Sequence, residues 1–159
     1  MSKIFRNQQL DELTHKASQS ERLRAHLNIH ESLDAAVQRL FIATEPDTYM
    51  RPHRHPQAHK WELMILLNGK IDMLVFNDDG ILTQREVLSA SDVRVVEIPP
   101  NTWHAYVSQQ PGTVILEIKQ GAYLPTPAED FATWSPAENT PQAAACLQWM
   151  RDATVGSKY

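Results

Sequence analysis

The chain has 159 residues, of which 42% are hydrophobic and 21% are charged, and its formal net charge is −4. These values are typical of a single globular domain, and a small acidic chain lacks the basic surface that nucleic-acid phosphates need. The longest aliphatic run, Leu63 to Leu67, is too short to span a bilayer, and the polar first residues do not resemble a secretory signal. We therefore expect a cytoplasmic protein that binds neither nucleic acid nor membrane.

The first element in chain order is a short helix over 7–18, with Asn7 as its N-cap. From about residue 21 the pattern changes to short apolar segments separated by turn residues. The predicted strands are 37–43, 61–67, 70–76, 93–98, 103–107 and 113–119. Asn68-Gly69 is a strong hairpin signal, and 77–80 closes a second hairpin. Many short strands without intervening helices predict an antiparallel sandwich or barrel.

The C-terminal tail has a different composition. Residues 124–142 are rich in Pro, Thr and Ala, and 142–151 predict a last helix. Trp134 and Trp149 are expected to hold this tail against the barrel or against a partner subunit. We expect one domain over 1–159, divided into an N-terminal helical segment (1–20), a barrel (21–123) and a tail (124–159).

Histidine and one glutamate are the chemically informative residues, because a single cysteine rules out a Cys-rich zinc site. His53 and His55 are two residues apart, so in extended chain they project to the same face. Glu62 begins an apolar strand, where a carboxylate is costly unless it is paired or bound to a cation. His104 follows a proline-rich turn. The alternative is a surface histidine, a core histidine and a carboxylate at a solvated rim; together, however, these residues supply three imidazoles and one carboxylate.

These segments resemble the two cupin motifs. His53-x-His55, Glu62 and Gly69 match the first motif, although six residues separate His55 from Glu62 where three or four are usual. Pro99-Pro100-Asn101 followed by His104 matches the second, with Asn101 in place of glycine. The chain is more specifically similar to the WbuC family of cupin-fold metalloproteins. That similarity rests on Asn28-x-His30-Glu31, 37–40, 51–55, 60–62, 97–100, 102–104 and Lys119-x-Gly121-x-Tyr123.

The resemblance implies an all-β, cupin-type antiparallel β-barrel or jelly roll with short flanking helices. It also implies one divalent metal ion, with His53, His55, Glu62 and His104 as ligands, and a homodimer. Three imidazoles and a carboxylate suit Fe, Mn, Ni, Cu or Zn, and affinity alone does not choose among these ions.

Three further residues are candidates for substrate binding. Arg51 shares a face with the two histidines and would hold a carboxylate or phosphate, the alternative being an Arg–Asp pair at the barrel mouth. His30 lies in a segment that the family resemblance marks. Lys60 flanks Glu62 and is expected to close over a ligand.

Three residues are candidates for catalysis. Tyr106 lies two residues past His104 on the same face, where its hydroxyl lines the pocket or simply packs in the core. Glu117 and Lys119 share one face of the last strand, as an internal acid–base pair or as a solvated ion pair.

Together these residues predict a metalloenzyme for a small polar or anionic molecule. The WbuC resemblance suggests a sugar or sugar nucleotide of surface-polysaccharide metabolism, with isomerisation or epimerisation favoured over oxygenation. The alternative is a non-enzymatic module or sensor that binds metal and a small ligand, since cupin folds carry many functions.

Overall fold

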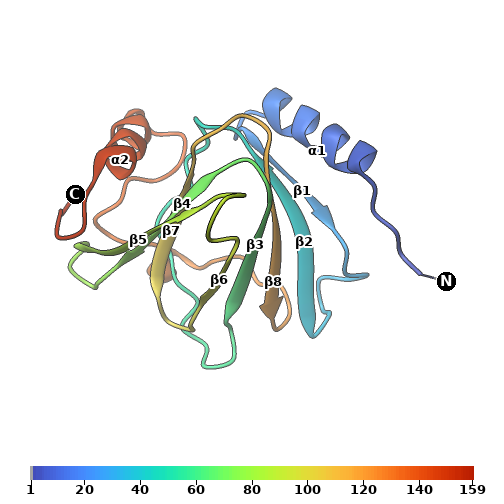
Figure 1. Ribbon diagram of the computed structural model, residues 1–159. Coiled ribbons are helices and arrows are strands. Elements are labelled where there is room, and N and C mark those ends of the chain that lie inside the picture. Colours follow the sequence, from blue (N-terminus) through green and yellow to red (C-terminus); the bar gives the residue numbers. More distant parts are fainter. Residues whose placement is uncertain (1) are drawn as a thin grey trace.

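The computed structural model describes residues 2–159 and contains two antiparallel β-sheets with a helix at each end of the chain (Figure 1). The elements are α1 (Asn7–Gln19), β1 (Arg24–Asn28), β2 (Val37–Thr44), β3 (Glu62–Asn68), β4 (Ile71–Phe76), β5 (Leu82–Leu88), β6 (Val95–Ile98), β7 (Trp103–Ser108), β8 (Thr113–Gln120), the short 3-10 turn Ala128–Asp130 and α2 (Pro141–Asp152). One sheet has the order β1-β2-β8-β3-β6 and the other the order β5-β4-β7. The predicted jelly roll is therefore confirmed.

The main core lies between the two sheets. Inward residues alternate along the strands: Met64 and Leu66 of β3 face Met73 of β4 and are almost fully buried. Tyr106 of β7 belongs to the same cluster. This cluster makes one part of the interior apolar. The polar interior residues gather around Glu62, at the start of β3.

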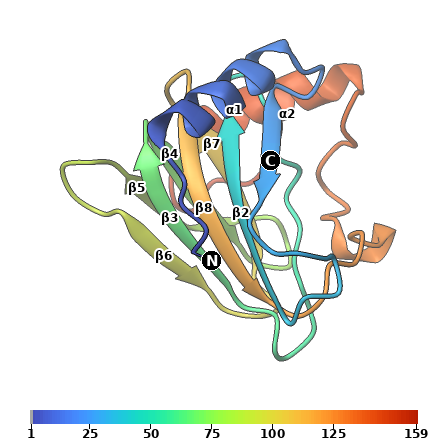
Figure 2. The same cartoon turned by 90° about the vertical axis from the view of Figure 1, so that its right-hand side faces the viewer.

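The two helices cover the outer faces of the sheets (Figure 2). On α1, Leu13 and Ala17 pack against Phe41 and Val114 of the larger sheet. The helix begins at Asn7 itself, so the prediction of Asn7 as N-cap is wrong: Arg6 is the cap, and its backbone N–H donates to Gln9 Oε1 at 2.8 Å. No helix within residues 2–159 is long and apolar enough to cross a membrane.

The tail packs against the smaller sheet, as its tryptophans predict. Trp134 and Trp149 both contact Phe76 of β4, with ring centroids 5.0 and 6.2 Å away. Gly80 has a φ of +80°, and a Cβ there would lie 2.8 Å from the Trp134 ring, so the β4–β5 turn needs glycine on both counts. The tail is thus an integral layer of the fold.

A second attachment of the tail is an ion-pair cluster around Glu138. Its carboxylate pairs with Arg22 at 2.9 Å and with the buried Arg24. Burial opposes ionisation of Glu138, but the hydrogen bonds and charges of the two arginines outweigh it and lower the Glu138 pKa. The carboxylate therefore stays ionised at neutral pH and neutralises Arg24.

We expect Glu138→Gln to lower the free energy of unfolding by about 2 kcal/mol at pH 7, because it leaves Arg24 buried without its counter-charge. The folded-state pKa lies below the ordinary 4.5, so this contribution is complete above pH 4.5 and disappears as pH falls through the folded-state value. Urea unfolding at pH 7 and at about pH 3.5 measures the difference in free energy of unfolding between variant and parent, which should be smaller at the lower pH. Glu31→Gln, which removes an exposed pair with Lys3, is the control and should have little effect. An equal difference in free energy of unfolding at both pH values contradicts the role of the Glu138 carboxylate as counter-charge of Arg24.

Candidate metal centre

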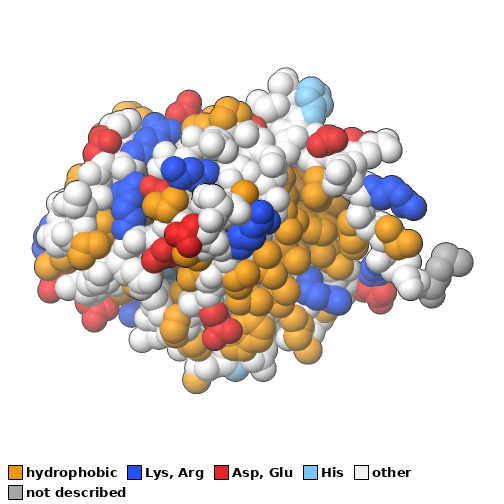
Figure 3. Space-filling model, in the orientation of Figure 1, with side chains coloured by type: hydrophobic (Ala, Val, Ile, Leu, Met, Phe, Trp, Pro, Cys, Tyr) orange, Lys and Arg blue, Asp and Glu red, His pale blue; other side chains and the backbone are white. Residues whose placement is uncertain are grey.

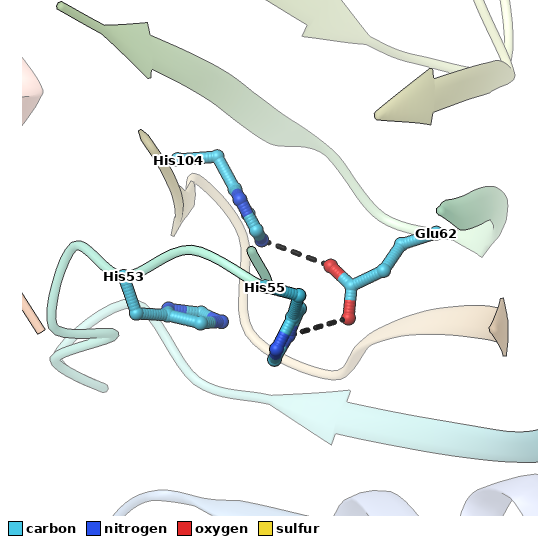
Figure 4. Close-up of side chains that lie close together, drawn as sticks. All are labelled: His53, His55, Glu62 and His104. Atoms are coloured by element: carbon cyan, nitrogen blue, oxygen red, sulfur yellow. Dashed lines mark ion pairs between the residues drawn. The ribbon is translucent and has the colours of Figure 1, made fainter. Parts of the chain in front are cut away.

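Four side chains from three parts of the chain converge at one end of the barrel (Figure 4). Glu62 is the first residue of β3 and points inward, as Met64 does two residues later. His104 is the second residue of β7 and is also buried. His53 and His55 lie on the segment between β2 and β3. His53 is held in place because its backbone N–H donates to His104 O at 3.0 Å and its carbonyl accepts from His104 N at 2.9 Å.

The spacing of the four ligand atoms matches what one ion requires, since all lie within 4.8 Å of one another. Glu62 Oε2 is 2.9 Å from His104 Nε2, and Glu62 Oε1 is 3.1 Å from His55 Nε2. Adjacent ligands each about 2.1 Å from a metal ion lie about 3.0 Å apart in octahedral coordination and about 3.4 Å apart in tetrahedral coordination. The longer loop after His55 therefore still brings Glu62 to the two histidines.

Hydrogen bonds to the backbone orient two of the imidazoles. His53 Nδ1 lies 3.0 Å from Arg51 O, and His104 Nδ1 lies 2.8 Å from Thr102 O. A ring N–H that donates to a carbonyl leaves the Nε2 lone pair free, which is how metal-binding histidines are usually held. In both residues that Nε2 faces the cluster.

His55 gives an independent indication. Its Nε2 is buried and, despite the 3.1 Å approach of Glu62, has no hydrogen-bond partner with suitable geometry among residues 2–159. A buried nitrogen of this kind is costly, and coordination of a cation relieves the cost. The turn residue Asn101 supports the same loop: it has a φ of +58°, which explains the glycine of the cupin motif, and its N–H donates to His55 O at 2.7 Å.

The protonation states also suit a metal ion. Burial, with the nearby His104 as a second cause, lowers the pKa of His53 to about 3, so this ring is neutral. Burial alone would raise the pKa of Glu62, but the adjacent His104 and His55 and the charge of Lys119 hold it well below its usual range. Burial opposes protonation of His104, but the Glu62 carboxylate raises the His104 pKa, so a metal ion would displace a proton there. A neutral imidazole and an ionised carboxylate are the forms that coordinate cations. The residues present therefore fit a divalent metal.

A cavity of about 510 Å³ opens beside the four residues. This volume is within the range of small-molecule sites. Five of the six other predicted site residues line it: His30, Arg51, Tyr106, Glu117 and Lys119.

Lys119 and its two carboxylate partners form a continuous ionic chain in the interior. Lys119 Nζ lies 3.0 Å from Glu117 Oε1 and 3.3 Å from Glu62 Oε1. Burial opposes the charge of Lys119, but the two carboxylates outweigh it and raise the lysine pKa. Of the two interpretations of Glu117 and Lys119, the internal pair is the one observed, and it connects directly to the Glu62 carboxylate.

Tyr106 lies on the cavity wall, with its hydroxyl buried and without a hydrogen-bond partner in the described chain. Burial and the charge of Glu117 raise its pKa, so the phenol keeps its proton at neutral pH. It is both a core residue and a cavity residue.

Two predicted substrate-binding residues are engaged elsewhere. Arg51 donates to Ala132 O at 3.2 Å and to Ser135 O at 3.0 Å, so it chiefly attaches the tail; no Asp pairs with it among residues 2–159. The prediction that Lys60 closes over a ligand stays a prediction. Lys60 lies outside the large cavity and donates to Ala122 O at 3.1 Å, because it belongs to a turn before β3 and the strand alternation does not extend to it.

The sequence reasoning missed the cavity wall formed by β1 and its flanks. Arg22, Arg24, His26, Asn28 and His30 all line the cavity. A period-two signal was present, because these polar residues alternate with Leu23, Ala25, Leu27 and Ile29. The two faces are exchanged relative to an ordinary barrel strand. The apolar residues of β1 face α1 on the outside of the sheet, and the polar ones face the cavity inside.

The comparisons with solved structures agree with this fold. KdgF from Halomonas sp. is 11% identical, with 66% of this chain and 85% of KdgF covered and a TM-score of 0.52. A structural-genomics protein of Shewanella oneidensis is 12% identical, with 79% and 84% covered and a TM-score of 0.57. Oxalate decarboxylase of Bacillus subtilis is 12% identical, with 86% of this chain but only 36% of that chain covered, and a TM-score of 0.52. At these identities the likeness shows a cupin fold and nothing finer.

Comparison by sequence gives a family but no characterised relative. A search of curated proteins found no significant match. The model of a family described as a domain of unknown function, DUF6016, matches residues 5–88, which is just over half of the chain. The matched segment includes His53, His55 and Glu62. The chain therefore belongs to the DUF6016 family.

Proposed function

We propose that this protein binds one divalent metal ion through His53, His55, Glu62 and His104 and uses it to act on a small polar or anionic molecule. The observation that carries the proposal is the convergence of four donor atoms within 4.8 Å beside an open cavity. A bound divalent ion would supply Lewis acidity to a substrate oxygen. Lys119 and Glu117 are positioned to hold and move a proton next to it.

The charge of the cavity supports an anionic ligand. Four cationic side chains line it against three carboxylates, which leaves a formal charge of +1 that a divalent ion raises to +3. The side chains concerned are Arg22, Arg24, Arg51, Lys119, Glu62, Glu117 and Glu138. A positive, partly enclosed site concentrates negatively charged small molecules.

The resemblance to the WbuC family directs the search towards a sugar or sugar nucleotide, with isomerisation or epimerisation before oxygenation. A non-enzymatic metal-binding module or ligand sensor is the second candidate. The 510 Å³ cavity favours a ligand over a purely structural ion, but binding alone would also use it.

The experiment that tests the function is a substrate screen on protein loaded with a defined metal. Sugars, sugar acids and nucleotide sugars are incubated with and without oxygen, and products are identified by NMR. An enzyme gives turnover that requires the metal and is lost in Lys119→Met. Binding without turnover for every compound identifies the binding module.

We also propose that the protein is a homodimer formed through the outer face of the larger sheet. The part of this face that α1 leaves uncovered is the apolar area over β3, β8 and β2 in Figure 3. Leu67, Val37 and Val95 on it are 39%, 39% and 50% exposed. A second copy is the fitting occupant, because an exposed apolar patch is complementary to itself across a two-fold axis and carries none of the net charge of −4 that would repel another copy.

Light scattering is expected to give about twice the 18.1 kDa chain mass. Leu67→Glu should yield monomer, because it places a charge in the proposed interface. Val87→Glu is the matched control, since Val87 is equally exposed at 39% but lies on the smaller sheet. A monomeric parent protein, or equal effects of the two substitutions, rules out this interface.

A further inference from the structure

One wall of the cavity carries polar groups that the metal ligands do not use. It is formed by β1 and its flanks, and we call Arg22, Arg24, His26, Asn28 and His30 the β1 wall. In the sheet order, β1 is three strands from β3, which holds Glu62. Three strand spacings amount to roughly 14 Å along the sheet, so the β1 wall and the metal centre are separate regions of one cavity.

His30 on this wall has a defined hydrogen-bonding state. Its Nδ1 lies 3.0 Å from the backbone N of Arg39 and 2.9 Å from Arg39 O. That carbonyl already accepts the N–H groups of Ile29 at 2.8 Å and His30 at 3.3 Å. In an antiparallel strand the N–H and C=O of one residue point to the same side, so the Arg39 N–H also faces His30. Nδ1 is therefore the acceptor, and the ring proton is on Nε2.

The Nε2–H of His30 has no acceptor. The side chain is only 7% exposed, and its Nε2 is buried without a hydrogen-bond partner anywhere in residues 2–159. The hydroxyl of Tyr106, which reaches the same cavity from the opposite sheet, is likewise buried and unpaired. Two buried donors without acceptors are unfavourable, and oxygen atoms of a ligand would satisfy both.

The β1 wall also has a positive charge. Arg22 and Arg24 share a single counter-ion, Glu138. Partial burial is the main cause that lowers the pKa of His26 to about 4, and the charges of Arg24 and Arg22 add to it, so this ring is neutral. Six residues of extended chain, roughly 20 Å, separate Arg24 from His30. The excess cation therefore lies at the far end of the wall and attracts an anion into the cavity, while the unpaired N–H of His30 is the group that contacts it.

We propose that the His30 end of the β1 wall is the subsite for the anionic group of the ligand, with His30 Nε2–H donating to it and Tyr106 O–H donating to a neighbouring ligand oxygen. The ligand class is a small polyhydroxylated compound that carries a carboxylate or phosphate at one end. This inference rests on the proposed function, because it assumes that the cavity binds a small polar molecule.

Two substitutions of His30 separate its two nitrogen atoms. In His30→Asn the side-chain oxygen takes the place of Nδ1, so the Arg39 N–H keeps an acceptor while the cavity donor is removed. In His30→Gln the amide N–H takes the place of Nε2–H, so the cavity donor stays while the bond to Arg39 is weakened. The probes are D-glucuronate, D-glucose 6-phosphate and neutral D-glucose, measured by calorimetry on zinc-loaded protein.

We expect at least one anionic probe to bind about tenfold or more tightly than D-glucose, and the tighter one identifies carboxylate or phosphate as the recognised group. His30→Asn should weaken that binding about tenfold or more while leaving the melting temperature unchanged. His30→Gln should keep binding within about threefold of the parent but lower the melting temperature, because the Arg39 N–H loses its acceptor.

Parent-like binding by His30→Asn, equal binding of glucose and the anions, or no binding of any probe would each overturn the subsite. Zinc content is measured on every sample and is expected to be one ion per chain, because His30 is not a metal ligand. A failed subsite with zinc intact leaves the proposed function standing, whereas a parent protein without zinc counts against the proposed function itself.

Discussion

A protein with both His53→Ala and His104→Ala is expected to remain folded and to contain less than about a tenth of a metal ion per chain, against about one in the parent. His53 and His104 are joined by a β-bridge, their ring centroids are 4.5 Å apart, and both belong to the four-residue cluster. Two remaining ligands do not compete with buffer and water for a divalent ion. Elemental analysis after dialysis against a defined metal measures the content.

The matched control is His59→Ala with His15→Ala, which removes two exposed histidines and should leave the metal content unchanged. A second readout is thermal stability: added zinc should raise the melting temperature of the parent, because it binds only the folded state, and should not raise that of the double variant. Metal retained at parental levels in the double variant would exclude the four-residue centre.

Arg85→Met is expected to lower the free energy of unfolding by about 3–5 kcal/mol. Arg85 pairs with the buried Asp72 and donates to Met150 O at 2.9 Å, Ala153 O at 2.8 Å and Arg151 O at 2.8 Å. One guanidinium therefore neutralises an interior carboxylate and satisfies the carbonyls at the C-terminal end of α2, which no backbone N–H reaches. Methionine fills similar volume but removes the donor to the three carbonyls, and it leaves Asp72 with the neutral Gln109 amide in place of a counter-charge.

Urea unfolding of the metal-free protein measures this loss. Arg94→Met is the control, because Arg94 donates only to the exposed Ala90 O, and it should change stability by less than about 0.5 kcal/mol. Equal stabilities of the two variants would mean that Arg85 does not hold α2 in place.

Much of the barrel and all four metal-site residues follow from local sequence patterns. The pair His53 and His55 needs only the alternation of side chains along an extended chain. Asn68-Gly69 does mark the turn between β3 and β4, but the predicted hairpin is wrong there, because β3 belongs to the larger sheet and β4 to the smaller one, and the two strands do not pair. The strand β1 was missed because the residues on its cavity face are polar and only Arg24 among them is buried within the strand, so hydrophobicity predicted a loop. Charged residues face the inside of the sheet at β1 because this strand borders the cavity. The cavity itself is formed by segments distant in sequence, so a local pattern does not reveal it.

The hydrogen-bond partners of Arg51 and Lys60 could not be predicted either, because they too lie far away in the sequence. Alternation indicates which way Arg51 points, but its partners lie in the tail more than 80 residues later. Lys60 is next to a strand but outside it, and the turn at 57–60 sets its direction.

The backbone around His53 links the metal centre to the end of the chain. His53 forms bridges to both His104 and Phe131, and the neighbouring backbone groups continue this pairing, with Arg54 N donating to Asp130 O and Ala132 N to Pro52 O. The segment that carries the first ligand is thus held between β7 and the tail. During synthesis on the ribosome, 131 residues must have been added before His53 has both neighbours. The four proposed ligands, with both strands of backbone that hold His53 in place, are therefore assembled only after most of the chain has been made.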